Sequence, residues 1–253
     1  MLDSSTKGLT FRVDDAKSVE YEESGFNSDS PYKKHPCKAI SSVLGGFIYM
    51  MFPGALYCIG VLSPYIQSYY QIPKDKNYTA DLMPATLFLN MFILPFGSYL
   101  VQRNVNPRLM IALGGTIAFP CFLIASFMTE SFLAFGILLC LGFSFNQGMA
   151  YMAPIHHCWL WWPKNPGLVS GIILGGFGFG GLIFDNVITA VINPWRDKVD
   201  DDGFYSDRVD ERFMMTWRVL ILCWFGLNII GIAMIFPGPS KPTKLAARVI
   251  TDS

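Results

Sequence analysis

The sequence is 253 residues long, with 52% hydrophobic, 15% aromatic and only 15% charged residues, and its mean hydropathy is +0.36. Nineteen basic and nineteen acidic residues give a formal net charge of zero, which excludes the surplus of positive charge that nucleic-acid binding needs. So apolar a composition also excludes a chain that is disordered throughout. The apolar residues gather in blocks near or above about 20 residues, which is typical of membrane-spanning helices.

The two ends of the chain are polar. Residues 1–37 hold no apolar run long enough for the core of a signal peptide, and their seven acidic residues argue against a mitochondrial transit peptide. We expect this segment to be a solvated, largely unstructured cytosolic tail. Residues 238–253 are expected to form a second, short cytosolic tail.

Six apolar blocks lie between these tails, and each is long enough to cross a bilayer as a helix. At a rise of 1.5 Å per residue, about 20 residues cover a hydrocarbon core of roughly 30 Å. We therefore expect an all-α membrane protein with a six-helix transmembrane domain over residues 38–237. The blocks cover residues 39–66, 80–101, 109–128, 131–154, 167–192 and 217–236.

Prolines and loops add detail to this expectation. Five prolines lie inside the first three blocks, and because membrane helices tolerate proline we expect bends in those spans. They are Pro53, Pro64, Pro84, Pro95 and Pro120. The connection from Pro194 to Thr216 is the only long one and is acidic, so we expect it to stand in water.

Basic residues beside the ends of the blocks indicate the orientation. With the N-terminus in the cytosol, nine Lys or Arg residues flank the spans on the inner side and six on the outer side. The inner ones are Lys33, Lys34, Lys38, Arg103, Arg108, Lys164, Lys241, Lys244 and Arg248, and the outer ones are Lys74, Lys76, Arg196, Lys198, Arg208 and Arg212. We expect an integral multi-pass protein with both termini in the cytosol, and take the plasma membrane as the default location.

The sequence carries no familiar pattern of a catalytic or cofactor site. It has no Ser/His/Asp arrangement, no phosphate-cradling loop and no carboxylate pair for acid/base chemistry, so we do not expect an enzyme. His156 and His157 are adjacent in an expected loop without a third ligand at metal spacing, so we expect neither a metal site nor a cofactor. The glycine-rich residues 175–181 lie inside a span with no strand before them, which argues against a nucleotide-binding fingerprint.

Seven glycines lie in the fifth block. Gly171, Gly175 and Gly178 are spaced i, i+4 and i+7, on one face of a helix. Lipid gives no hydrophobic drive for helix association, so close backbone approach through small residues supplies the packing energy. The spacing predicts that these three glycines form a helix-packing face that needs a partner helix.

Asp185 continues this glycine face and is the one ionisable side chain well inside an apolar block. A charge at the centre of a span costs roughly 2.5 to 3.5 kcal/mol on insertion scales. One interpretation is therefore a proton or cation coupling site that faces a polar cavity or partner. The other is that Asp185 lies near the outer interface and is hydrogen-bonded to Asn186 or Thr189.

Uncharged polar residues at bilayer depth are the remaining candidates for a substrate pathway. Gln147 and Tyr151 are one helical turn apart, and with Asn146 we expect them to line one cavity. Tyr57 and Asn90 are further candidates. Amides at this depth also commonly bind neighbouring helices to each other, so helix packing is the alternative for each of them.

The fourth and fifth blocks carry a recognisable order of glycine, aromatic residues and proline. It comprises Gly148-x-x-Tyr151-x-x-Pro154, Trp162-Pro163, Gly167-x-x-x-Gly171 and the Gly-Phe-Gly-x-Gly segment at 176–180, with supporting similarity at Gly54-x-x-Tyr57 and Asn106-Pro107-Arg108. This pattern resembles the major facilitator superfamily, in particular its oxalate/formate antiporter and monocarboxylate porter branch. The resemblance covers residues 39–236 and implies the N-terminal six-helix half of that fold.

Two features depart from that family. Its loop between the second and third helices normally begins Gly-x-x-x-Asp, whereas Gly97 is here followed by Val101. A complete transporter of this kind has two six-helix halves with the substrate near the midplane between them, and this chain holds one. The resemblance implies that basic residues of the second half hold a carboxylate, and the six blocks here contain no Lys or Arg at bilayer depth.

Functions from different classes remain open. The first is a half-size transporter of monocarboxylates or other small organic anions, which works by alternating access when it pairs with a second half, either a second copy of this chain or a separate one. The second is a membrane interaction subunit that derives from a transporter, has lost transport and belongs to a larger membrane assembly. The third is a truncated product.

Overall fold

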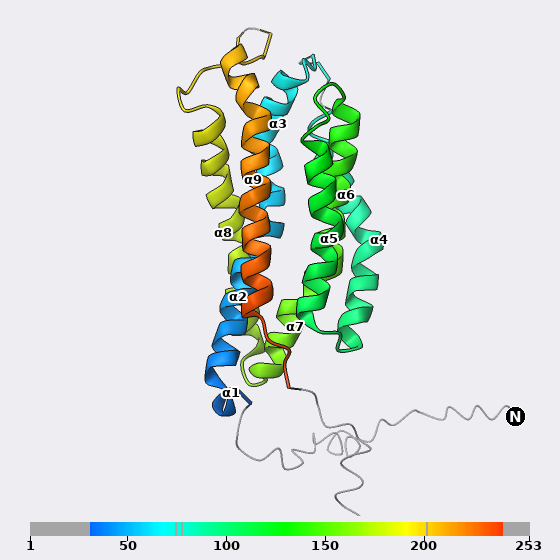
Figure 1. Ribbon diagram of the computed structural model, residues 1–253, viewed down its shortest axis with the longest axis vertical. Coiled ribbons are helices and arrows are strands. Elements are labelled where there is room, and N and C mark those ends of the chain that lie inside the picture. Colours follow the sequence, from blue (N-terminus) through cyan, green and yellow to red (C-terminus); the bar gives the residue numbers. More distant parts are fainter. Residues whose placement is uncertain (1–30, 74, 77, 201, 240–253) are drawn as a thin grey trace, which may run out of the picture.

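The computed structural model describes residues 31–73, 75–76, 78–200 and 202–239 of the chain. Figure 1 shows a bundle of long helices that run side by side along its longest axis. The short helix α1 (Pro31–Lys34) and the end of α9 (Asp207–Met234) lie at the same, lower end of the bundle (Figure 1).

Six helical spans among the described residues are long and apolar enough to cross a membrane, which confirms the expected all-α fold with six spans. The first span is built from α2 (Pro36–Gly54), η2 (Ala55–Cys58) and α3 (Ile59–Tyr69), and the fourth from α6 (Phe132–Ala150) and α7 (Met152–Trp161). The other four are α4 (Leu82–Gln102), α5 (Pro107–Ala125), α8 (Pro166–Ile192) and α9.

The first span changes its helical geometry near mid-depth. There the α-helix passes into the 3₁₀ turn η2 shortly after Pro53, as expected where proline removes a helical hydrogen bond. The fourth span runs on from α6 into α7 through Tyr151, whose backbone keeps α-helical angles (φ −54°, ψ −46°). Pro64, Pro95 and Pro120 lie inside α3, α4 and α5, each of which continues through its proline as one helix.

The last helix begins ten residues before its predicted start at 217, at Asp207. The second part of the expected loop over 194–216 is therefore helix: its charged residues lower the hydropathy, while Val209, Phe213 and Met214 are buried in the hydrophobic core. Arg218 donates to the carbonyl of Ser126, which follows the end of α5 (N···O 3.4 Å). About one turn before Arg218, α9 still packs on its neighbours, because the Phe213 ring contacts Tyr69 of α3 and Phe135 of α6 with centroid distances of 4.9 and 5.9 Å.

The tails differ slightly from their expected limits. Residues 31–37, which the sequence pattern places in the first tail, form α1 and the first residues of α2. The rest of the two expected tails, residues 1–30 and 240–253, lies outside the described residues.

Glycines allow α8 to pack directly on α2. A Cβ atom at Gly176 would overlap the backbone carbonyl oxygen of Phe47, and one at Gly180 would overlap that of Met51. Because both clashes are with backbone atoms, only glycine permits this distance between the two helices. This i, i+4 pair supplies the close backbone approach on which helix association in lipid depends.

Glycines also allow α4 to pack closely on α6. A Cβ atom at Gly97 would overlap the carbonyl oxygen of Gly148, and a Cβ atom at Gly148 would lie 2.7 Å from the Cβ of Ile93. Gly148 belongs to the Gly-x-x-Tyr-x-x-Pro motif of the fourth span, so part of that motif serves helix packing.

The interior of the bundle is rich in aromatic side chains. Trp217 and Trp224 of α9 are buried, with their ring centroids 5.6 Å apart, and both contact Phe122 of α5. Phe52 of α2 stacks on Trp224 with a centroid distance of 5.7 Å. These rings connect the first, third and sixth spans and fix the frame on which the polar residues are held.

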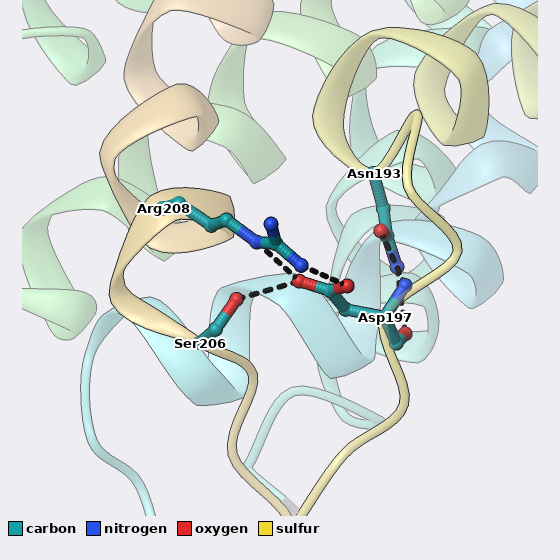
Figure 2. A network of polar contacts seen from close by, with 4 residues as sticks. All are labelled: Asn193, Asp197, Ser206 and Arg208. Atoms are coloured by element: carbon teal, nitrogen blue, oxygen red, sulfur yellow. Dashed lines mark hydrogen bonds and ion pairs between the residues drawn. The ribbon is translucent and has the colours of Figure 1, made fainter.

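A polar network orders the connection between α8 and α9 (Figure 2). The carboxylate of Asp197 accepts from Ser206 Oγ (2.8 Å) and from Nε (2.7 Å) and Nη2 of Arg208, and the Asn193 side chain exchanges two hydrogen bonds of 2.8 Å with the main chain of Asp197. The hydrogen bonds from Arg208 and Ser206 lower the pKa of the Asp197 carboxyl below its ordinary value, because they favour the ionised form.

At the opposite end, residues 235–239 form an extended segment, here called the strap, that crosses the lower end of the bundle. Phe236 N–H donates to Ser42 Oγ of α2 (2.9 Å), and Arg108 Nε of α5 donates to the Ile235 carbonyl (2.6 Å). Gly238 N–H donates to His157 Nδ1 of α7 (3.2 Å). The strap thus ties three helices together at this end.

Candidate functional site

A groove of about 490 Å³ lies between α4 and the fourth span, close to Tyr151, where α6 and α7 meet. Asn90 lies about 12 Å from the start of α4 and about 18 Å from its end, at 1.5 Å per residue, so the groove is near mid-depth. The groove is lined by Pro84, Leu87, Phe88, Asn90, Met91, Leu94, Gln147 and Tyr151. Three of the five predicted pathway residues other than Asp185 therefore share one groove.

Asn90 and Gln147 are joined directly, with Asn90 Nδ2 donating to Gln147 Oε1 at 2.8 Å. Asn90 is buried, with 7% of its surface exposed, whereas Gln147 is partly exposed. The close approach of α4 and α6 at Gly97 and Gly148 brings the two side chains within hydrogen-bonding distance. Fifty-seven residues separate the pair in sequence, so spacing alone could not predict this contact.

Tyr151 and Tyr57 are connected through a residue that the sequence reasoning missed, Phe177 of α8. The Phe177 ring meets Tyr151 edge to face with centroids 5.8 Å apart, and meets Tyr57 in the same way at 5.4 Å. Tyr57 lies in η2 and is 52% exposed. The signal that could have found Phe177 is its place between two glycines, Gly176 and Gly178, in the segment that carries the family resemblance.

Asn146 points away from the groove, although it precedes Gln147 in sequence. It is buried and accepts a hydrogen bond at its Oδ1 from the hydroxyl of Tyr49 on α2 (3.0 Å). It does not line the groove beside Gln147 and Tyr151. Consecutive residues of a helix point about 100° apart, which explains the separation. Asn146 thus connects two spans, which agrees with helix packing, the alternative to a place in the substrate pathway.

Asp185 lies on α8, one turn beyond Gly181, and is partly buried. Cys58 Sγ donates to the Gly181 carbonyl (3.5 Å), which places the end of η2 beside this part of α8. The Asp185 Oδ1 atom is buried without a hydrogen-bond partner among the described residues. Asn186 and Thr189 donate to the carbonyls of Leu182 and Asp185, so the expected side-chain bonds from them to the Asp185 carboxyl are not formed.

The predicted packing glycines lie on the opposite side of α8 from Gly176 and Gly180. Among the described residues, nothing lies within 4 Å of a Cβ atom built at Gly171 or Gly178, and at Gly175 the nearest atom belongs to the Phe47 side chain at 3.7 Å. Within this chain, α8 therefore packs through Gly176 and Gly180 instead. The i, i+4, i+7 spacing could not distinguish the two faces, because each carries glycines one turn apart, and a partner for the open face remains a prediction.

The two adjacent histidines lie on helix α7, and the expected loop is absent there. His157 is buried, with its Nε2 3.0 Å from the Val105 carbonyl oxygen and its Nδ1 accepting from Gly238 N–H. One ring nitrogen thus contacts the connection between α4 and α5, and the other holds the strap. The part of the chain that the structure describes contains no group of three or more His, Cys, Asp or Glu residues that could hold a metal ion.

Fold and site together define a class of protein. Six long apolar helical spans among the described residues, with a groove near mid-depth that carries polar side chains, are features of a multi-pass integral membrane protein of the transporter type. Comparison with known proteins gives the same class. The chain is 24% identical over 261 residues to the apicoplast pyruvate carrier 1 of Toxoplasma gondii, an alignment that covers 83% of this chain and 48% of the carrier.

Two fungal proteins are also similar. An MFS-type transporter 1 of an Ophiocordyceps species is 31% identical over 173 residues, covering 64% of this chain and 37% of that protein. The agnestins efflux protein AgnL12 of Paecilomyces divaricatus is 23% identical over 240 residues, covering 92% of this chain and 49% of the efflux protein. The chain is therefore an MFS-like multi-pass membrane protein, and it spans about half the length or less of the curated relatives it matches.

Neither a protein-family model nor a solved structure matches the chain. The oxalate/formate branch in particular has no support beyond the resemblance of the fourth and fifth spans.

Proposed function

We propose that this chain forms one six-helix half of a transporter for small monocarboxylates or related organic anions. It works by alternating access against a second six-helix unit, for which a second copy of this chain is the simplest source. The observation that carries the proposal is a row of side chains that connects the first and fourth spans to α4 and α8 near mid-depth, namely Tyr57, Phe177, Tyr151, Gln147 and Asn90.

Three further features support a second unit and an anionic substrate. Gly171 and Gly178 leave an open face on α8 into which another helix could pack closely. The curated relatives extend over about twice the length of the alignment, and one of them is named as a pyruvate carrier. Among the described residues, those that line the groove include no cationic side chain, so a second unit would supply any charge that pairs with a carboxylate.

The test is uptake of radiolabelled pyruvate into proteoliposomes that contain the full chain as their only protein. We expect saturable uptake that unlabelled monocarboxylates inhibit, and none in protein-free liposomes. Absence of uptake at every protein-to-lipid ratio tried would overturn the proposal that two copies form a transporter.

The second candidate function, a membrane interaction subunit without transport, is favoured by one departure from the family pattern, Val101 in place of the usual aspartate. Purification in a mild detergent separates the two functions. Stable co-isolation with a larger assembly supports the subunit, and a homodimer alone supports the transporter.

For the orientation, we propose that the lower end in Figure 1 faces the cytosol and that the protein resides in the plasma membrane. Lys33, Lys34, Lys38, Arg103 and Arg108 lie at or near this end of their helices, in agreement with the rule that basic loops stay inside. In intact cells, an epitope tag at the N-terminus should resist external protease, while surface biotinylation should label the protein. Cleavage of the tag would reverse the orientation, and lack of labelling would refute the location.

A further inference from the structure

The groove between α4 and the fourth span contains hydrogen-bonding groups but no side chain that carries a charge at neutral pH. Five of its eight lining residues are apolar, and the polar ones are Asn90, Gln147 and Tyr151. A carboxylate that enters it meets neutral groups only. What this groove recognises therefore depends on which of its groups donate and which accept.

The hydrogen bond from Asn90 to Gln147 determines which atoms of the Gln147 amide face a ligand. A Gln side chain has one acceptor, Oε1, and two donors on Nε2. Asn90 Nδ2 occupies Oε1 at 2.8 Å. No hydrogen bond between described residues uses Gln147 Nε2, and this atom is not among the buried polar atoms without a partner. The amide is therefore held by its oxygen, and its N–H groups are free for a ligand.

Tyr151 supplies a second donor one turn further along the same face. Its N–H donates to the carbonyl of Gln147 (3.0 Å), which fixes the backbone between the two. Its ring is held against Phe177 by an edge-to-face contact at 5.8 Å, while no hydrogen bond between described residues uses its hydroxyl. Both donors thus project from a rigid part of the fourth span, which favours precise recognition.

We propose that Gln147 and Tyr151 form a specificity site for small carboxylic acids, in which neutral donors hold the oxygen atoms of the ligand. Asn90 is a positioning residue that keeps the oxygen of the Gln147 amide turned away from the ligand. This inference rests on the proposed function, and it adds the residues and the kind of contact that select the ligand. Ligands that lack oxygen acceptors, such as small alkylammonium ions, gain nothing from these donors.

A binding assay tests the site without requiring transport. The full chain is placed in lipid nanodiscs, and equilibrium binding of radiolabelled pyruvate is measured for the wild type and variants. Gln147→Met keeps the side-chain length but removes the donors, and we expect its Kd to rise at least about tenfold, the effect of losing one hydrogen bond of about 1.5 kcal/mol to a charged group. Tyr151→Phe keeps the ring and its contact with Phe177, and should raise the Kd by about three- to tenfold.

The positioning role of Asn90 is tested by combining variants. Asn90→Leu alone should raise the Kd several-fold, because the Gln147 amide can then turn its oxygen to the ligand. In the Gln147→Met background the same change should have no further effect, because Asn90 acts only through Gln147. Leu222→Met, which alters an exposed residue of α9 outside the groove, is the control and should leave the Kd unchanged.

Each outcome decides a separate point. Equal Kd values for the wild type and Gln147→Met, or no saturable binding by a folded wild type, would overturn the specificity site. Additive effects of Asn90→Leu and Gln147→Met would overturn the positioning role and indicate a structural one. Binding with the expected pattern but without uptake in proteoliposomes would refute transport and support the specificity site. Uptake that Gln147→Met does not alter would support transport and refute the specificity site.

Discussion

Replacing single glycines of α8 by alanine tests how the bundle is assembled. A methyl group at Gly176 would overlap the carbonyl oxygen of Phe47, and a backbone atom cannot turn aside as the end of a flexible side chain can. Helices α2 and α8 must then separate by about 1 Å along their contact, which sacrifices dispersion contacts on both sides. Overpacking of this kind typically costs about 1–3 kcal/mol, and we expect Gly176→Ala to lie near the upper end.

Gly178→Ala is the matched control, two residues away on the same helix. Its methyl group would meet nothing within 4 Å among the described residues. Alanine is the better helix former by about 1 kcal/mol in water, so this variant should be neutral or slightly more stable. Gly176→Ala gains the same propensity, so the expected difference between the two variants is the overpacking cost alone, about 1–3 kcal/mol.

The assay is reversible unfolding of the purified protein in mixed micelles, with a rising mole fraction of dodecyl sulfate and helix content followed by circular dichroism. Gly176→Ala should unfold at a clearly lower fraction than the wild type, and Gly178→Ala at the same or a higher one. Equal destabilisation by both changes, or a greater loss for Gly178→Ala, would refute the assignment of the packing face.

Two further predictions concern the ends of the bundle. Because the pKa of Asp197 is lowered in the folded protein, its ionised carboxylate stabilises the fold above the ordinary pKa of about 4, and this stabilisation is lost as the pH falls below that value. Thermal unfolding at pH 3 to 7 should show the loss for the wild type and much less of it for Asp197→Asn. Identical pH profiles of the two proteins would contradict the prediction. A methyl group at Gly238 would lie 2.5 Å from the Cβ of Leu160, so Gly238→Ala should release the strap at a cost of about 1–3 kcal/mol and speed amide hydrogen exchange over residues 235–239. Gly226→Ala is the control, because a methyl group there meets open space among the described residues, and it should leave the exchange unchanged. Slow exchange in both variants would count against the strap.

Hydropathy predicts the six spans because the length of an apolar helix is set by the bilayer, whatever its neighbours are. The same reasoning misses the start of the last helix, since six of the ten residues from Asp207 to Thr216 are polar and lower the hydropathy, although Val209 and Phe213 are buried in the hydrophobic core. A contact with another element, the hydrogen bond from Tyr205 N–H to Ser68 Oγ at 2.8 Å, lies just before that helix begins.

The candidate site is predictable only where its residues are close in sequence. Gln147 and Tyr151 are one turn apart and do share a groove. The pairing of Gln147 with Asn90, the bridging ring of Phe177 and the turning away of Asn146 depend on the mutual rotation of helices, which the close contacts at glycines fix. Sequence spacing gives the repeat along each helix, but not the direction in which that repeat faces.

The central claim is that the open face of α8 belongs to an interface and pathway between two six-helix units and does not face lipid. The most direct test is labelling of a cysteine by a membrane-impermeant maleimide, in a background with the six native cysteines replaced by serine or alanine. Gly178→Cys lies about 18 Å from the lower end of α8, and Leu222→Cys, whose parent side chain is 71% exposed, lies at the corresponding distance on α9. The account predicts that the cysteine at 178 is labelled and that pyruvate slows the reaction, while the one at 222 stays unlabelled; a cysteine at 178 that is as unreactive as the one at 222, with or without pyruvate, would contradict it.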